Sequence, residues 1–255
     1  MISKKQLKEI ADRNKINLYF QEKDYLLNIF LYSLYREAKE KKIVFKGGTC
    51  LKIVYNYPRF LEDLDFGTAL NPKQIEKIFH KALEAFRLID IEYEIIKEEI
   101  FEKSFTAKIR FNGPLYTGRK ETSNSIMIDI GERGKILMKP LWKQVNSQYS
   151  DIPNYFVLAM NEEEIFAEKA RAFLMRKKPR DMFDLWCMIS KGVQSNLLIK
   201  KLKEKNVLPE IEFPSKTEYE RDIGSLLPVL PPYNQVSSEI KISLEKMLKR
   251  RGNNG

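Results

Sequence analysis

A double-glycine turn between two apolar segments constrains this chain more than any other feature. Residues 43–45 are apolar and favour a strand, and residues 49–55 carry apolar side chains at a spacing that favours a helix. Gly47 and Gly48 separate them, and because glycine has no Cβ, their N–H groups can approach an anion closely. The start of the helix adds unpaired donors, and Thr49 can cap it or bind a phosphate. The segment predicts a phosphate-binding turn, although an ordinary turn gives the same pattern.

Two aspartates lie two residues apart in the next apolar run, which predicts a strand over 61–66. The period of a strand places Asp63 and Asp65 on one face. Two converging carboxylates repel each other unless a cation lies between them, and their hard oxygen atoms suit Mg²⁺ or Mn²⁺. A pair of such ions about 3.5–4 Å apart is the usual device for displacement at phosphorus. An Asp-x-Asp pair on a solvated edge strand is the alternative interpretation.

The order and spacing of these two motifs resemble the signature of polymerase-β-like nucleotidyltransferases. Lys-Gly-Gly-Thr at 46–49 and Arg-Phe-Leu-Glu-Asp-Leu-Asp-Phe at 59–66 resemble more closely the AbiEii/AbiGii toxin family of that superfamily. The resemblance covers residues 43–190. It implies an α/β (α+β) fold, in which a small mixed sheet with flanking helices is followed by a helical bundle. It also implies metal ligands at Asp63 and Asp65 and binding of a nucleoside triphosphate (NTP) by Lys46, Gly47, Gly48 and Thr49.

Leu61 departs from the family pattern, since relatives commonly have a small hydroxyl residue there. In the strand interpretation it shares the face of the two aspartates. Leu61 can therefore narrow the predicted nucleotide pocket or exclude water from one side of it, which leaves the nucleotide preference open.

A third acid, Asp129, lies in an apolar run at 125–130 that predicts another strand, with three isoleucines on its other face. An acid in so apolar a strand is costly unless it is paired or bound to a cation. By analogy with the superfamily, Asp129 is expected to complete the metal site or to accept a proton from the attacking hydroxyl. The alternative is an acid beside Gly131, at the strand end, that faces water.

A helix is predicted over 162–177, with Asn161 as its N-cap and Glu164 at the capping-box position. Lys169 lies on the apolar stripe of this helix, so we expect it to reach into a cleft. The resemblance assigns such a lysine to the triphosphate, where it offsets charge on the leaving pyrophosphate. Glu168 lies on a different stripe and is expected to form an ion pair with another helix.

The family pattern Arg-Asp-x-x-Asp matches Arg180, Asp181 and Asp184. A structural interpretation competes equally, with Asp181 as a cap or first-turn acid of the next helix and Arg180 paired with Asp184 at i, i+4. The resemblance makes Asp181 the functional acid, which orients Lys169 or Arg180, and places Arg180 with the nucleotide-binding residues. Asp184 is then structural.

Composition favours an intracellular enzyme that acts on a polyanion. The formal net charge of the 255 residues is +10, which suits a nucleic-acid partner, although a general solvated surface gives the same count. Cys50 and Cys187 are expected in the core of a protein from a reduced compartment, and the single histidine, His80, at a surface or satisfied position. Because no signal segment or long apolar run occurs, we expect a cytoplasmic protein without membrane association.

The order of predicted elements suggests two domains. A nucleotidyltransferase domain is expected over 1–158 and a C-terminal helical domain over 159–255, with the active site in the cleft between them. The stretch with Pro140, Trp142 and Pro153 is expected to be a loop. Basic residues that could guide RNA are Arg59, Lys108, Arg110, Lys139, Arg171, Arg176, Lys177 and Lys178.

The predicted function is metal-dependent transfer of a nucleoside monophosphate from an NTP to RNA, such as a tRNA 3′ end. The resemblance adds a role as the toxin of a toxin–antitoxin or phage-defence pair, with a cognate antitoxin as partner. Two alternatives stay open. One is a nucleotidyltransferase of the same fold that modifies a protein or a small molecule. The other is a non-catalytic module that binds RNA or a partner, against which the presence of all three acids argues.

Overall fold

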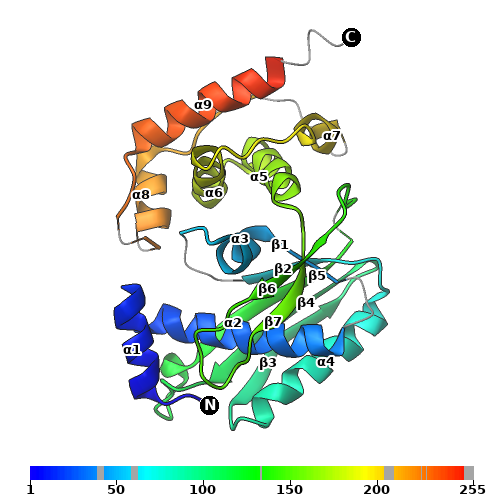
Figure 1. Cartoon of the computed structure of the whole chain (residues 1–255), viewed down its shortest axis with the longest axis vertical. Coiled ribbons are helices and arrows are strands. Elements are labelled where there is room, and N and C mark those ends of the chain that lie inside the picture. The colour runs from blue at the N-terminus through cyan, green and yellow to red at the C-terminus, as the bar shows by residue number, and fades with distance from the viewer. Residues whose placement is uncertain are drawn as a thin grey trace. The chain divides into compact units, whose positions relative to one another are not determined.

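The computed structural model divides into two compact units, which Figure 1 shows with the chain coloured by residue number. The first unit comprises Met1–Val54, Leu61–Ile136 and Pro140–Met160. The second comprises Tyr55–Phe60, Leu137–Lys139 and Asn161–Gly255. The structure describes residues 1–38, 43–58, 63–132, 134–203, 210–224, 226–227 and 229–249.

A mixed seven-stranded sheet with strand order β3-β4-β5-β2-β1-β7-β6 forms the centre of the first unit. β2 pairs with β5 and β1 pairs with β7 in parallel, and the other neighbours are antiparallel. This confirms the predicted fold class, with a mixed sheet and flanking helices. The strands are β1 (Val44–Lys46), β2 (Asp63–Gly67), β3 (Glu92–Ile100), β4 (Ser104–Asn112), β5 (Asn124–Gly131), β6 (Leu141–Val145) and β7 (Tyr155–Ala159).

Two helices of the first unit, α2 and α4, pack on each other and on the sheet (Figure 1). α2 contacts β5 and β7, whereas α4 contacts β3 and β4. Asn71 begins α4 with a capping box to Gln74, and Phe79 and Phe86 of α4 are fully buried. The helices of this unit are α1 (Lys4–Asn14), α2 (Leu18–Glu37), α3 (Gly47–Tyr55), α4 (Pro72–Arg87) and the 3₁₀ turn η1 (Lys120–Thr122). Tyr55, the last residue of α3, belongs to the second unit.

The second unit is helical. α6 contacts α5, α8 and α9, and α5 also contacts α7. In the described part of the chain, no helix combines the length and hydropathy needed to cross a bilayer. The helices are α5 (Glu162–Arg176), α6 (Pro179–Ser190), α7 (Leu198–Lys203), α8 (Lys216–Gly224) and α9 (Tyr233–Lys249).

The loop predicted around Pro140 and Pro153 is wrong, since β6 and β7 form there. β7 alternates buried and less buried side chains, with Tyr155, Val157 and Ala159 inside. Because Pro153 lies just before β7, the sequence pattern there favours a loop and not a strand. The sequence also favours helices over 21–41 and 195–205, of which residues 39–41 and 204–205 lie outside the described residues, and it predicts no helix at the position of α8.

Candidate active site

One row of polar side chains crosses four strands of the sheet. Asp65 lies opposite Lys46 of β1 and opposite Asp129 of β5, and Asp129 lies opposite Thr106 of β4. Directly opposed residues of neighbouring strands point to the same face. The sheet therefore holds these two carboxylates side by side, with a lysine in the same row.

The other face of β5 is apolar. Ile126, Ile128 and Ile130 are fully buried, whereas Asp129 is partly exposed. This confirms the predicted division of the strand into two faces. Asp129 lies on the half-open side, where water or a ligand can reach it.

Asp63 precedes Asp65 by two residues in β2 and therefore lies on the same face, and it is the more exposed of the two. In the described part of the chain, three potential metal ligands have ligand atoms within 4.8 Å of one another at Glu76, His80 and Glu98. This cluster lies elsewhere in the first unit. Asp63, Asp65 and Asp129 thus share a face without being gathered that closely. Arg59 and Leu61, which the sequence placed beside this site, lie outside the described residues.

Gly47 begins α3 in a left-handed backbone conformation, with φ at +77°. A Cβ built there would lie 2.3 Å from Oδ2 of Asp65, well inside contact distance. Glycine thus satisfies both the backbone angle and the close approach of the carboxylate. The turn and the aspartate, which the sequence linked only through spacing, are in direct contact.

Thr49 is buried, and its hydroxyl donates a hydrogen bond to the carbonyl oxygen of Asp63 at 2.5 Å. Since α3 begins at Gly47, Thr49 lies within the helix and is not its N-cap. The contact fixes α3 to β2. Phosphate binding by Gly47, Gly48 and Thr49 stays a prediction.

The second unit contains a buried charge cluster around Lys169, whose side chain is 13% exposed. Its ammonium lies 2.7 Å from Asp184 and 3.2 Å from Asp181, both of which are buried. Arg176 donates to both carboxylate oxygens of Asp181, at 2.7 and 3.1 Å. Asp181 lies in the first turn of α6 and contacts both cations, and Asp184 contacts Lys169.

A second buried cluster was not found from the sequence. Glu164 accepts hydrogen bonds at 2.8 Å from the N–H groups of Leu137 and Met138, and it pairs with Lys201 at 2.8 Å. The predicted capping box at Glu164 is therefore wrong, because its carboxylate is directed to these partners. Lys201 also lies 3.4 Å from Glu168, which confirms the predicted ion pair between helices.

Basic side chains accompany the acidic row on the same face of the sheet. Lys108 lies opposite Met127, which in turn lies opposite Asp63. Arg110 is two residues further along β4 and forms an ion pair of 2.6 Å with Glu94 of β3. Two of the predicted RNA-guiding residues thus belong to the face that carries the aspartates.

Structural comparison finds similar folds at low sequence identity. MenT4, a nucleotidyltransferase toxin from Mycobacterium tuberculosis H37Rv, matches with a TM-score of 0.72 and 14% identity over 97% of this chain and 90% of that chain. JHP933 from Helicobacter pylori matches with a TM-score of 0.58 and 17% identity over 89% of this chain and 90% of that chain. A comparison with curated proteins finds no match.

The family model described as "Nucleotidyl transferase AbiEii toxin, Type IV TA system" matches residues 29–233, which is most of the chain. The matched segment includes the glycine turn, the three aspartates and the Lys169 cluster. The chain therefore belongs to the AbiEii family of nucleotidyltransferase toxins of type IV toxin–antitoxin systems, and it is a nucleotidyltransferase.

Proposed function

We propose that this nucleotidyltransferase transfers a nucleoside monophosphate from an NTP to RNA, with Mg²⁺ or Mn²⁺ as its metal and the cytoplasm as its site of action. The observation that carries the proposal is the shared face of Asp63, Asp65 and Asp129, directly beside the Gly47 turn. Family membership supports an NTP substrate and an antitoxin partner, and argues against the non-catalytic module.

The donor set suits a hard divalent cation, because it consists of carboxylates on a partly exposed face. Asp63 and Asp65 would hold the ion, and Asp129 would either complete its coordination or serve as the general base. Bound there, Mg²⁺ would polarise the α-phosphate and offset charge that develops on its oxygen atoms.

In the proposed step, the acceptor hydroxyl oxygen forms a bond to the α-phosphorus, and the bond from that phosphorus to the bridging oxygen of the β-phosphate breaks. Pyrophosphate leaves. In its role as general base, Asp129 accepts the hydroxyl proton, and Lys46 and the N–H groups of Gly47 and Gly48 hold the triphosphate. Lys169, oriented by Asp181 and Asp184, offsets charge on the leaving pyrophosphate, and Arg180 assists in nucleotide binding.

RNA is the favoured acceptor class, and a tRNA 3′ end is the specific acceptor we propose to test first. Net charge of +10 supports a polyanionic partner. Lys108 and Arg110 lie on the same sheet face as Asp63 and Asp129, which supports a path for a phosphate backbone towards the carboxylates.

The test is incubation of the protein with each α-labelled NTP, Mg²⁺ and total cellular RNA, followed by gel analysis. Asp65→Asn removes one carboxylate with little change of shape. Asp90→Asn is the matched control, because Asp90 lies at an exposed position with φ at +57°, which asparagine tolerates.

Label in a tRNA-sized band with the wild type and Asp90→Asn, but not with Asp65→Asn, is the expected result. Label in protein would replace the RNA proposal with the protein-modifying alternative. Label in RNA that persists at the wild-type rate in Asp65→Asn would contradict the assigned site.

A further inference from the structure

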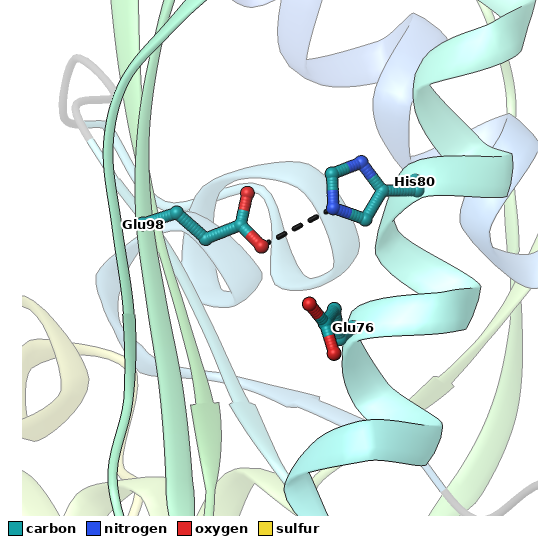
Figure 2. A group of neighbouring side chains, drawn as sticks. All are labelled: Glu76, His80 and Glu98. Carbon is teal, nitrogen blue, oxygen red and sulfur yellow. Dashed lines mark hydrogen bonds and ion pairs between the residues drawn. The ribbon is translucent and has the colours of Figure 1, made fainter.

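Three side chains with metal-ligand atoms converge at the edge of the first unit, away from the row of aspartates. Glu76 and His80 come from α4 and Glu98 comes from β3 (Figure 2). One ligand atom of each lies within 4.8 Å of the other two. Nε2 of His80 lies 3.2 Å from Oε1 of Glu98. This cluster has no part in the proposed transfer.

A β-bulge directs Glu98 towards the helix. The pairing of β3 with β4 shifts by one residue between Ile95 and Lys97. Beyond the shift, Glu98 lies opposite Ala107, a fully buried residue on the helix-covered face. Without the extra residue, strict alternation would place Glu98 on the opposite face, with Lys108 and Asp129. Bulges commonly re-aim a side chain in this way.

The helix presents its two ligands from a fixed position. Glu76 and His80 are four residues apart, and residues at this spacing lie on the same helix face. Phe79, next to His80, is fully buried against Phe105 of β4, with ring centroids 4.8 Å apart. The backbone on both sides of the cluster is therefore held by packing, whereas the ligand side chains remain accessible, with that of His80 47% exposed.

We propose that Glu76, His80 and Glu98 bind one divalent transition-metal ion of the zinc class, which links α4 to the edge strand β3. Imidazole nitrogen and carboxylate oxygen atoms are both zinc ligands, and three protein ligands leave the fourth position of a tetrahedral site open for water. Ligand atoms at bonding distance around one such ion lie about 3.4 Å apart, so a small rotation of these accessible side chains closes the site.

This site differs in chemistry and position from the aspartate row. Imidazole favours zinc-class ions over Mg²⁺, whereas the aspartate row offers only carboxylates. Glu98 is directed to the helix-covered face, and Asp65 and Asp129 to the other. Zinc binding should therefore persist in excess Mg²⁺.

The single histidine makes the test direct, because every imidazole signal in the NMR spectrum belongs to His80. We would titrate the ¹⁵N-labelled full chain with Zn²⁺ in excess Mg²⁺ and follow both ring nitrogens. The expected result is saturation at one ion per chain, with a large shift of Nε2, Nδ1 kept protonated, and a rise in Tm.

Glu76→Gln and Glu98→Gln should each weaken zinc binding at least tenfold and abolish the rise in Tm. Glu99→Gln is the matched control, because Glu99 is the next residue of β3 but lies opposite Thr106 on the other face, so it should bind zinc like the wild type. Unchanged His80 signals, or zinc binding with wild-type affinity in both glutamate variants, would overturn the proposal. The measurement needs no transferase activity, so failure of the proposed function would leave it intact.

Discussion

The carboxylate of Asp65 occupies the space that a side chain at Gly47 would need. Gly47→Ala should therefore displace Asp65 and reduce kcat/KM for nucleotide transfer by about a hundredfold, since a displacement of 1 Å at a reacting centre can cost that much. Gly192→Ala is the control. Its φ of +78° imposes the same backbone strain, but nothing lies within 4 Å of the added Cβ. An equal loss of activity in both variants would show that the strained backbone causes the loss, and not the displacement of Asp65.

Lys169 and Arg176 both contact Asp181, and their separate removal tests which cation serves the reaction. Lys169→Met should lower kcat by about 10²–10³, the usual effect of losing one group that stabilises charge in a transition state. Arg176→Met removes the other cation from the same carboxylate, but this side chain is 59% exposed, and kcat should change by less than tenfold. Similar losses in both variants would mean that Asp181 only stabilises the fold.

Periodicity and spacing predicted much of the first unit. The alternation of Ile126, Ile128 and Ile130 gave β5 and the open face of Asp129, because a strand with one buried face must repeat every two residues. The pairing of Asp65 with Lys46 and Asp129 could not be predicted, because register depends on contacts between segments far apart in the chain.

Buried polar partners were harder to predict than apolar faces. Lys201 lies in a lysine-rich segment that suggests an exposed helix, and only the fold places it against Glu164. The bulge that directs Glu98 towards His80 has no signal in the sequence either, because charged residues dominate β3 from Lys97 to Glu99. Both features depend on which elements become neighbours.

The ion pair of Lys201 and Glu164 should matter strongly for stability, since neither side chain has any exposed surface. Lys201→Met leaves a buried carboxylate without its cation and should lower the free energy of unfolding by about 3–5 kcal/mol. Lys216→Met, which breaks the exposed pair with Glu220, should cost less than about 1 kcal/mol. Urea unfolding measures the free energy of unfolding of both variants. An equally small loss in the two variants would contradict the interpretation of Lys201 and Glu164 as a desolvated ion pair.

Glu22 should make stability depend on pH. Burial raises the pKa of its carboxyl above the ordinary value of 4.5, and hydrogen bonds from Leu115 and Asn124 only partly oppose this shift. Between 4.5 and the raised value, the folded chain keeps a proton that the unfolded chain releases, so its stability falls as pH rises. Glu22→Gln does not titrate, so the wild type should lose stability relative to this variant over that range. Urea midpoints measured from pH 4 upwards test this, and a constant difference between the two proteins would show that the pKa is not raised.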